Sequence, residues 1–419
     1  MLIVLLVGLV LMRESREQPG ARIEEGFVNW LAANTARVMP TPPLALVEIN
    51  DSSLANGHAW PWSPFDFALF LETALSMQPA VAGIEPALDW DDQMLPPSAK
   101  LKLPQYEKIL HDRILRAPKI LLGAQLGFPE DPDIIPPLQP VLVLRHIKGA
   151  AANIPQFTAI EHEPAEELRL AATLGFTNVP APSGGGLVRR APLLFAYRGQ
   201  VVPSFVLQAM MLWLALGPED VKVDLGSSID MGGKMSIPID ATGGMLVDFK
   251  SPFTRIGFDD LLLAKAQIDA NKTPVVAPSD LRDKFVLLAR TDVASRTVDL
   301  PIARKGSPGE LFAAAIATLQ NQTFIRRVGT WFDGCVIVLA MLLSWFLYRR
   351  PRRLALAITS IGMVAYLLIG LAVFNASLVA LPLVLPVGLA VIIVLFRIFA
   401  PRDGILPHQP LAENKPPVV

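Results

Sequence analysis

Residues 328–399 read VGTWFDGCVIVLAMLLSWFLYRRPRRLALAITSIGMVAYLLIGLAVFNASLVALPLVLPVGLAVIIVLFRIF. They contain three apolar runs, at 328–348, 354–374 and 378–396, with one acidic residue, Asp333, near the start of the first run. Each run has about 20 residues, enough for a helix that crosses a hydrocarbon core of about 30 Å. The helices of a soluble core would carry a polar face, which these runs lack. We therefore expect a block of three transmembrane helices at 328–399.

The two connections between the runs differ in charge. Residues 349–353, RRPRR, join the first run to the second, whereas the uncharged residues 375–377, NAS, join the second to the third, and Arg397 follows the third. Short loops rich in Lys and Arg stay in the cytoplasm. The arginines at 326–327 favour the opposite orientation but are fewer. This bias predicts a cytoplasmic C-terminus and places the chain before the first run outside the cytoplasm.

The length, charge and cysteine content of the chain exclude some classes of function. The chain has 419 residues, 52% of them hydrophobic, and a mean hydropathy of +0.42, which averages the apolar block with a region of ordinary composition. That region, residues 21–322, has about 300 residues, enough for one large domain or two small ones. A net charge of −1 gives no electrostatic basis for binding nucleic acid. The single cysteine, Cys335, lies in the first apolar run, so we expect no disulfide and no cysteine metal site in the outer region.

The N-terminal residues 1–12, MLIVLLVGLVLM, are the only candidate for the membrane crossing that an outer region requires. A helix of this length reaches about 18 Å, short of a core of about 30 Å. The segment also lacks the basic start and the small-residue cleavage site of a signal peptide. We expect a membrane anchor whose beginning is missing, as when a start codon is assigned too late. Apolar residues at helical spacing in 23–38 then predict an amphipathic helix that leads away from the membrane.

The outer region alternates apolar strand patterns with helical ones. Residues 44–49 form a buried-strand pattern, Ser63 is placed to cap a helix at 64–77, and 80–84 is the next strand. This order of strand, helix and strand is typical of a parallel α/β unit. Residues 141–170 fit no single pattern of secondary structure. We expect further helices at 106–116, 204–216, 258–266 and 308–319, and further strands at 119–125, 174–179, 187–197, 234–237, 245–249 and 285–289. The expected fold class is α/β: a mixed α/β outer domain, a short apolar N-terminal anchor and a C-terminal three-helix transmembrane block.

Four groups of residues mark the outer region in a definite order. They are VEINDSSL (47–54) with WPW (60–62); GFTNV (175–179) with VRRAPL (188–193) and PSF (203–205); IPID (237–240) with VDF (247–249); and LRDKFVLL (281–288) with DLP (299–301) and SPG (307–309). In this order and spacing, and followed by three apolar runs, they resemble the CHASE2 family of extracytoplasmic sensor domains. The resemblance covers roughly residues 44–399.

The apolar runs, the arginine bias and the resemblance together predict a domain organisation. They predict a membrane anchor at 1–12, a CHASE2-like extracytoplasmic sensor domain at 21–327, three transmembrane helices at 328–399 and a cytoplasmic Pro-rich tail at 400–419. Members normally continue after the helices into a nucleotide cyclase, a histidine kinase or a Ser/Thr kinase. This chain ends in the tail instead, so unless it is truncated we expect its output protein to be a separate partner such as a cyclase or kinase.

Three positions depart from the pattern of the family. Relatives usually have Asp at Glu85, Gly at the pair Ala289 and Arg290, and a His-Ala pair at Ala313 and Ala314. Ligand contacts that relatives make at these positions are therefore not carried over to this chain.

No catalytic signature is found in the sequence. The glycines at 184–186 are not followed by the G-K-[S/T] of a P-loop, and the chain has no H-E-x-x-H, no G-x-S-x-G and no kinase set. His162 in the acidic run 161–163 fits a solvated surface better than a metal site. Asp89 in the acidic loop 89–92 likewise fits a solvated loop better than a cation cage. We expect no enzymatic activity, no catalytic residue, no metal and no cofactor.

Four side chains are candidates for a ligand site: Asp51, Trp60, Trp62 and Arg189. Asp51 follows the first strand, and open α/β sheets bind ligands at the carboxyl ends of their strands. The two tryptophans would wall a pocket there, or else pack the turn and the next helix against the core. Arg189 would pair an acidic ligand, or else Arg189 or Arg190 pairs Asp51 or Glu85 as a structural ion pair. We expect these turns to converge because each adjoins a strand of one sheet.

Together these patterns favour a multi-pass sensor of a bacterial inner membrane, with its main domain in the periplasm. Its ligand must bind one of two helix arrangements more tightly, or no signal passes. The expected partners are an unknown small-molecule or protein ligand, the lipid bilayer and the separate output protein, with homodimer formation left open and no nucleic acid. The alternative is an envelope structural or assembly protein that uses the outer domain as a protein-binding module. A membrane-anchored periplasmic enzyme is the least supported class.

Overall fold

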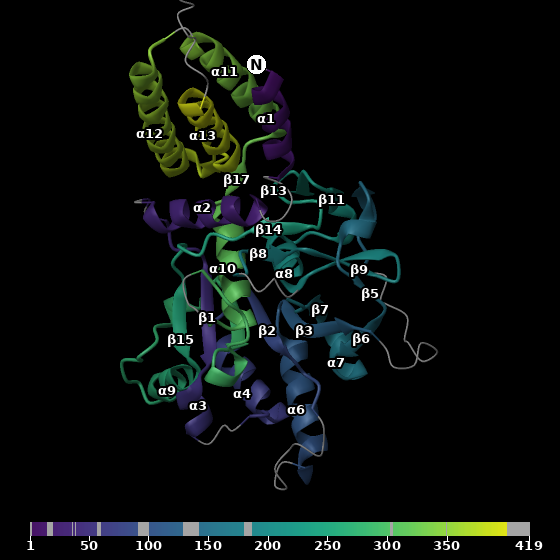
Figure 1. The fold of residues 1–419 in the computed structure, drawn as a ribbon. Coiled ribbons are helices and arrows are strands. Elements are labelled where there is room, and N and C mark those ends of the chain that lie inside the picture. Colours follow the sequence, from purple (N-terminus) through teal and green to yellow (C-terminus); the bar gives the residue numbers. More distant parts are fainter. Residues whose placement is uncertain are drawn as a thin grey trace, which may run out of the picture. The chain divides into compact units, whose positions relative to one another are not determined.

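The computed structural model describes residues 2–14, 20–35, 37, 39–56, 60–90, 100–128, 142–179, 187–301, 305–348 and 350–399. The chain divides into two compact units (Figure 1). Unit 1 comprises Met1–Thr35 and Arg327–Val419, and unit 2 comprises Ala36–Arg326. Helix α2 (Gly20–Asn34), which we expected to begin the outer domain, belongs to unit 1.

The centre of unit 2 is a seven-stranded sheet with the order β15-β1-β16-β2-β3-β6, in which β7 also pairs with β3. All of its pairs are parallel except β3 with β6, which is antiparallel. The strands are β1 (Leu44–Ile49), β2 (Val81–Ala87), β3 (Ile120–Gly127), β6 (Ala159–His162), β7 (Thr173–Phe176), β15 (Thr254–Gly257) and β16 (Phe285–Arg290). The expected mixed α/β fold is confirmed, with β1, β2, β3, β7 and β16 at the predicted apolar runs.

The central strands are buried on both faces. In β1, Leu44 and Leu46 pack in one hydrophobic core, whereas Val47 and Ile49 pack in another. Successive side chains of a strand point to opposite faces of the sheet, so the two cores lie on its two sides. Strands covered on both faces need nearly continuous apolar runs, which is why this sheet could be recognised in the sequence.

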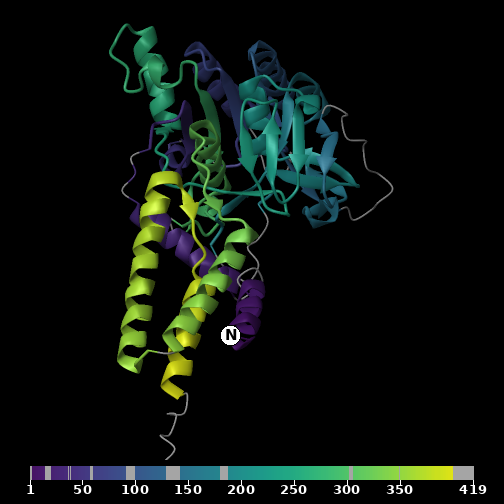
Figure 2. The same ribbon diagram turned by 90° about the horizontal axis from the view of Figure 1, so that it is seen from above.

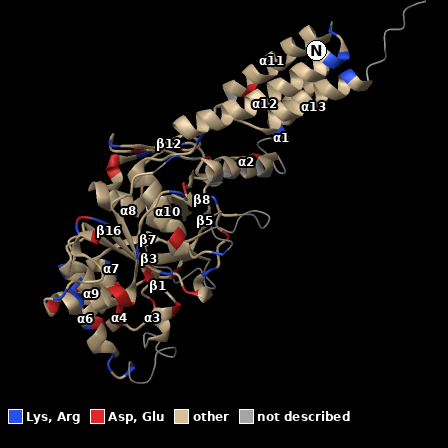
Figure 3. Ribbon diagram, turned by 90° about the vertical axis from the view of Figure 1, so that its left-hand side faces the viewer, with Lys and Arg blue, Asp and Glu red and all other residues tan. Residues whose placement is uncertain are grey.

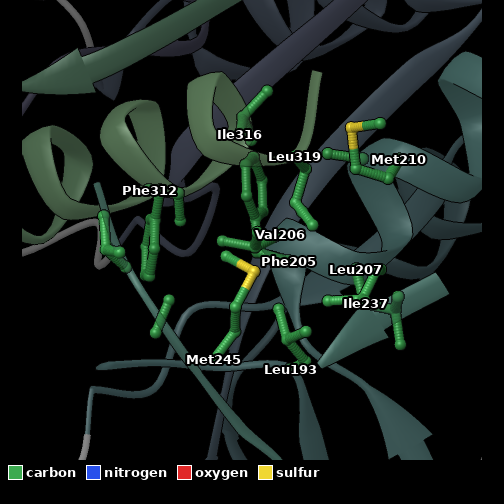
Figure 4. Packing of buried hydrophobic residues seen from close by; sticks show 14 of the residues in the cluster. Leu193, Phe205, Val206, Leu207, Met210, Ile237, Met245, Phe312, Ile316 and Leu319 are labelled. Carbon is green, nitrogen blue, oxygen red and sulfur yellow. The ribbon is translucent and has the colours of Figure 1, made fainter. Parts of the chain in front are cut away.

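Five described helices of ten or more residues contribute to the two cores. Helices α8 (Phe205–Leu214) and α10 (Pro308–Asn321) pack in the first core, and α4 (Pro64–Ser76), α6 (Leu103–Arg116) and α9 (Phe258–Asp269) pack in the second. Figure 4 shows Phe205 of α8 among side chains of α10, and its ring stacks on that of Phe312 with centroids 5.7 Å apart. All five helices lie at predicted positions. Ser63 is the N-cap residue of α4 as expected, and its N–H and hydroxyl donate to the carboxylate of Asp66, at 2.9 and 2.7 Å.

The remaining strands of unit 2 form three smaller sheets. These are β5 (Gln156–Phe157) with the hairpin β9 (Leu194–Tyr197) and β10 (Gln200–Pro203); β4 (His146–Lys148) with β11 (Val221–Asp224), β12 (Ser228–Met231) and β13 (Ser236–Pro238); and β8 (Arg190–Pro192) with β14 (Gly244–Leu246). The predicted strand at 187–197 is therefore two strands with different partners. Residues 142–170 supply β4, β5, β6 and α7 (Glu166–Ala171), and their short strands pair with distant segments, which is why they showed no local pattern.

Unit 1 contains α1 (Leu2–Glu14), α2, α11 (Thr330–Tyr348), α12 (Arg352–Ser377) and α13 (Val384–Phe399). Figures 1 and 2 both show α11, α12 and α13 side by side. These helices carry few charged residues along their length, and basic residues gather at the end where α11 passes to α12 (Figure 3).

Two described helices are long and apolar enough to cross a membrane, Trp331–Tyr348 and Arg352–Ser377. The third expected span is shorter than predicted, because α13 has 16 residues. Pro382 lacks a backbone N–H and restricts the residue before it, so the helix begins at Val384 rather than near 378.

Candidate functional site

The carboxyl ends of β1 and β16 lie side by side, since Ile49 and Arg290 are register partners in the parallel pair. β2 lies on the other side of β16, with Ile84 opposite Leu288. In open parallel sheets, ligands bind in the crevice outside this edge. The loops that leave these strands therefore form the place to look for a functional site.

Arg290 is the centre of a polar cluster at this edge. Its Nε donates to Oδ1 of Asp292 and its Nη2 donates to Oδ2, both at 2.9 Å, which is the bidentate arrangement that a planar guanidinium favours. The same guanidinium lies over the ring of Trp60, with Cζ 4.0 Å from the ring centroid. Two strand-end loops are thus joined through one side chain. We refer to Trp60, Glu85, Arg290 and Asp292 together as the Arg290 cluster.

The pKa values of the two carboxyl groups in the cluster are shifted in opposite directions. Asp292 is buried, which by itself opposes ionisation, but the hydrogen bonds and charge of Arg290 hold its pKa below the usual range. Burial raises the pKa of Glu85 to about 7, although the backbone N–H and charge of Arg290 act against this rise. The Arg290 N–H lies 3.5 Å from Oε2 of Glu85, a long contact. Near neutral pH the cluster therefore holds a fixed ion pair beside a carboxyl group that titrates.

Close backbone packing places Glu85. The pairing of β2 with β3 is irregular between Ile84 and Ala87, on either side of Glu85. Gly123 of β3 lies so close that an added Cβ would be 2.1 Å from the Glu85 carbonyl oxygen. Only glycine accommodates such an approach of two backbones, so Gly123 fixes the point at which β2 departs from regular pairing.

Asp51 belongs to the same edge of the sheet. It begins α3 (Asp51–Ala55), whose N-cap Asn50 accepts the Ser53 N–H at 3.0 Å. One carboxylate oxygen of Asp51 accepts the N–H of Val293 at 3.1 Å. This bond ties the loop after β1 to the loop after β16, three residues beyond Arg290.

The two tryptophans of the W-P-W motif have different environments. Trp62 is 2% exposed and packs against the rings of Phe67, at 5.5 Å, and Phe258, at 4.5 Å, so it contributes to the core beneath α4 and α9. Trp60 is half-buried and stacks on Arg290. Of the two alternatives stated for these residues, Trp62 adopts the packing arrangement, and Trp60 takes part in the polar cluster.

Arg189 does not adjoin the sheet that holds Asp51, so our expectation that all four candidates adjoin one sheet was wrong. It precedes β8, which pairs with β14, and its carbonyl oxygen accepts the Val247 N–H at 3.0 Å. The adjacent Arg190 forms an ion pair with Asp240 at 2.9 Å, between its Nη1 and Oδ2. Strand pairs between distant segments cannot be read from local periodicity, which is why the two sheets were merged.

Sequence reasoning missed the roles of Arg290 and Asp292. The signal was available, because a charged residue ends the buried strand 285–289 and an acidic residue follows it two positions later. His162, expected in a solvated run, pairs with Asp89 at 2.8 Å. The other aspartates of the loop, Asp91 and Asp92, lie outside the described residues. Among the side chains that the structure describes, no group of three or more His, Cys, Asp or Glu could hold a metal ion.

A second ion-pair group links the same edge to helix α10. Nη2 of Arg255, on β15, donates to Oε1 of Glu48 and to Oε1 of Glu310, each at 2.6 Å. Glu310 also accepts the N–H of Ser307, the N-cap of α10, at 3.0 Å. In the same turn, Gly309 lies against β16, where an added Cβ would be 2.2 Å from Cβ of Ala289. The first turn of α10 is therefore held against the strand that ends in the Arg290 cluster.

A parallel α/β domain with a polar cluster at its carboxyl edge, in a chain with two long apolar helices, fits a membrane-associated binding domain. A family model of the CHASE2 domain matches residues 2–348, and the chain therefore belongs to the CHASE2 family. The CHASE2 domain is an extracellular sensor domain of signalling proteins, which binds extracellular ligands and signals to output domains. No curated protein and no solved structure matches the chain.

Proposed function

We propose that this chain is a multi-pass membrane sensor without catalytic activity of its own. In this proposal a ligand outside the cytoplasm binds at the Arg290 cluster beside Asp51. The resulting change passes through α10 to the helices of unit 1, and from them to a separate cyclase or kinase on the cytoplasmic side. Membership of the CHASE2 family supports the sensing role. The contacts of α10 support its part in passing the signal to unit 1.

Helix α10 connects the candidate site with both chain segments that lead to unit 1. Its first turn lies against Ala289, the neighbour of Arg290. At its last turn, the side chain of Asn321 donates to the Pro40 carbonyl at 2.7 Å, and that of Gln320 donates to the Pro43 carbonyl at 3.3 Å. Pro40 follows α2 in the chain and Asn321 precedes α11, so a shift of α10 acts on both connections at once. Small shifts of packed helices are a common form of signal in proteins.

Binding and relay can be tested in one experiment with the full chain in detergent. Cys335 is exposed on α11 and would carry a fluorophore that reports on unit 1. Small anionic, cationic and neutral compounds would be screened for those that raise the thermal unfolding midpoint. We expect binding compounds to change the emission at Cys335, and we expect Arg290→Lys to lose both effects.

The matched control is Arg190→Lys, which alters a second Arg–Asp pair on the β8–β14 sheet. It should retain both effects. Compounds that bind Arg290→Lys as well as the unaltered chain would show that the cluster is not the site. Compounds that bind without changing the emission would refute the relay and favour a protein-binding module of the envelope. A screen without any hit would count against sensing of small molecules at this edge.

The arginine asymmetry supports a cytoplasmic C-terminus, since short basic loops remain inside. Reporter fusions test this orientation. A phosphatase inserted in the exposed β9–β10 turn at Gly199 should be active outside the cytoplasm, and a fluorescent protein added after the last helix should be fluorescent inside. A phosphatase that is inactive at Gly199 despite normal accumulation would contradict the proposed topology.

A further inference from the structure

Helix α2 presents a buried stripe at helical spacing. Glu24, Val28, Leu31 and Thr35 follow one another at intervals of four, three and four residues, and all four are buried. The stripe faces the ends of two other helices of unit 1. Both Oε1 and Oε2 of Glu24 accept the Leu383 N–H, at 2.8 and 3.0 Å, and Oε1 also accepts the Val384 N–H at 2.7 Å.

These contacts locate α2 along the bundle. The first N–H groups of a helix lack partners within it, and a carboxylate satisfies them favourably, so Glu24 caps the start of α13. The hydroxyl of Thr35 donates to the side chain of Asn375, in the last turn of α12. The N–H of Val328, just before α11, donates to the Ala380 carbonyl at 3.4 Å. Helix α2 therefore lies at the bundle end where α11 begins, α12 ends and α13 begins.

A second stripe of α2 is apolar and exposed. Ile23 is 56% exposed and Trp30 is 51% exposed, with the half-buried Phe27 between them. The rings of Phe27 and Trp30 stack with centroids 6.0 Å apart. A helix with one face on protein and a separate exposed apolar face is suited to the boundary between lipid and water.

The aromatic residues of the bundle mark that boundary. Trp331, in the first turn of α11, is 70% exposed at the same end as α2. Trp345 and Tyr348 are exposed near the other end of α11. Tryptophan and tyrosine gather at the two interfaces of membrane proteins. Trp30 thus lies at the bundle end that Trp331 marks, at the edge of helices long enough to cross a membrane.

We propose that α2 is an interfacial helix whose exposed face, formed by Ile23, Phe27 and Trp30, docks onto the lipid surface at the outer side of the membrane. The lipid surface is the partner of this face because α2 lies at the bundle end that the exposed Trp331 marks, where helices long and apolar enough to cross a membrane begin or end. The same helix caps α13 through Glu24, so the position of α2 in the lipid acts directly on the start of α13. This gives unit 1 a contact with lipid headgroups in addition to its hydrocarbon-facing helices.

The test places one fluorophore at a time on the full chain in vesicles of phosphatidylcholine and phosphatidylglycerol. Trp30→Cys and, separately, Ile23→Cys would be labelled in a chain that carries Cys335→Ser. Lipids with a nitroxide near the headgroup or deep in the acyl chain serve as quenchers, and iodide serves as the aqueous quencher. An interfacial helix buries its apolar face by about 5–10 Å, so the shallow nitroxide should quench about twofold or more better than the deep one at both positions.

A control variant gives the reference for aqueous quenching. Lys108→Cys, at an exposed position of α6 in unit 2, should be quenched by iodide alone. Strong iodide quenching without lipid quenching at positions 23 and 30 would overturn the proposal. Protection from both quenchers would also overturn it, because unit 2 or a second copy would then cover the face. Gel filtration excludes misfolded variants. If one of the two labelled variants, at position 23 or position 30, fails to fold, the other still tests the same face.

Discussion

Arg290 and Trp60 lie in a cation–π contact, with Cζ of the guanidinium 4.0 Å from the centroid of the indole ring. The same guanidinium holds both carboxylate oxygens of the buried Asp292 at 2.9 Å. The planar guanidinium therefore contacts two partners at once, the face of the indole ring and the two carboxylate oxygens. Lysine has neither the plane nor the fork of donors that these contacts need.

Arg290→Lys should therefore destabilise the protein although it conserves the charge. Loss of the bidentate bond and of the stacking should lower the free energy of unfolding by about 1–3 kcal/mol. The measurement is the thermal unfolding midpoint of the full chain in detergent. Arg190→Lys changes a pair whose two side chains are both partly exposed, and it should cost about 1 kcal/mol or less. Equal losses in the two variants would mean that the Arg290 contacts contribute no more than a surface pair.

The difference between Trp60 and Trp62 shows where sequence reasoning reaches its limit. The W-P-W motif and the capping serine predict a tight turn into α4, which the structure confirms. Which ring enters the core depends on Phe258, contributed by a helix far along the chain, and which ring remains at the edge depends on Arg290. Strands such as β1 and β16 could be predicted because burial on both faces leaves an apolar run. The partners of a polar side chain leave no such local signal.

Glu85 should give the protein a pH-dependent stability. Burial raises its folded pKa from the ordinary value of 4.5 to about 7, against the opposing effect of Arg290. A carboxyl group with a raised folded pKa holds its proton more tightly in the folded state, so stability falls as the pH rises from about 4.5 to about 7 and then levels off. Glu85 is half-buried rather than fully enclosed, so we expect Glu85→Gln to gain on the order of 2 kcal/mol at pH 8 and little at pH 4.5.

The measurement is the unfolding midpoint of both proteins across this pH window. Asp248, whose pKa burial also raises, contributes a slope of the same sign to both proteins, so their difference isolates Glu85. Asp292 has a lowered folded pKa, so its contribution is present above its ordinary pKa and is lost only in more acidic solution. A difference between the two proteins that stays constant with pH would contradict a raised pKa for Glu85.

The contact between Gly309 and Ala289 should respond to a reciprocal exchange. In Gly309→Ala the new methyl group would meet Cβ of Ala289 at 2.2 Å, which forces α10 away from β16. Overpacking of this kind costs about 1–3 kcal/mol. The double variant Gly309→Ala with Ala289→Gly should recover most of that loss, because the methyl group has only moved across the contact. In α11, Gly334→Ala meets open space and should cost nothing measurable. Failure of the double variant to recover stability would mean that the clash is not the cause.

Glu24 caps α13 at the position where the helix begins. Hydropathy alone placed that beginning too early in the sequence. Residues 378–383 were predicted to be part of the third helix, but Pro382 interrupts the pattern of backbone donors there. The N–H groups of Leu383 and Val384 then need an acceptor outside the helix, and the carboxylate of Glu24 supplies it. An acidic residue in a helix separate in sequence from α13 is a partner that no local rule identifies.

Glu24→Ala should therefore open the first turn of α13 while leaving the rest of the bundle in place. Hydrogen bonds to a charged acceptor contribute about 1.5–3 kcal/mol, so amide hydrogen exchange at Leu383 and Val384 should accelerate about tenfold to a hundredfold. The measurement is hydrogen exchange of the full chain in lipid nanodiscs, read by mass spectrometry of peptides that cover the start of α13. Glu24→Gln keeps an oxygen acceptor without the charge and should show a smaller acceleration. The middle of α12 serves as the internal reference, and its exchange should not change. If exchange at Leu383 and Val384 is the same in Glu24→Ala as in the unaltered chain, Glu24 does not cap α13, and the link between α2 and the start of that helix is lost.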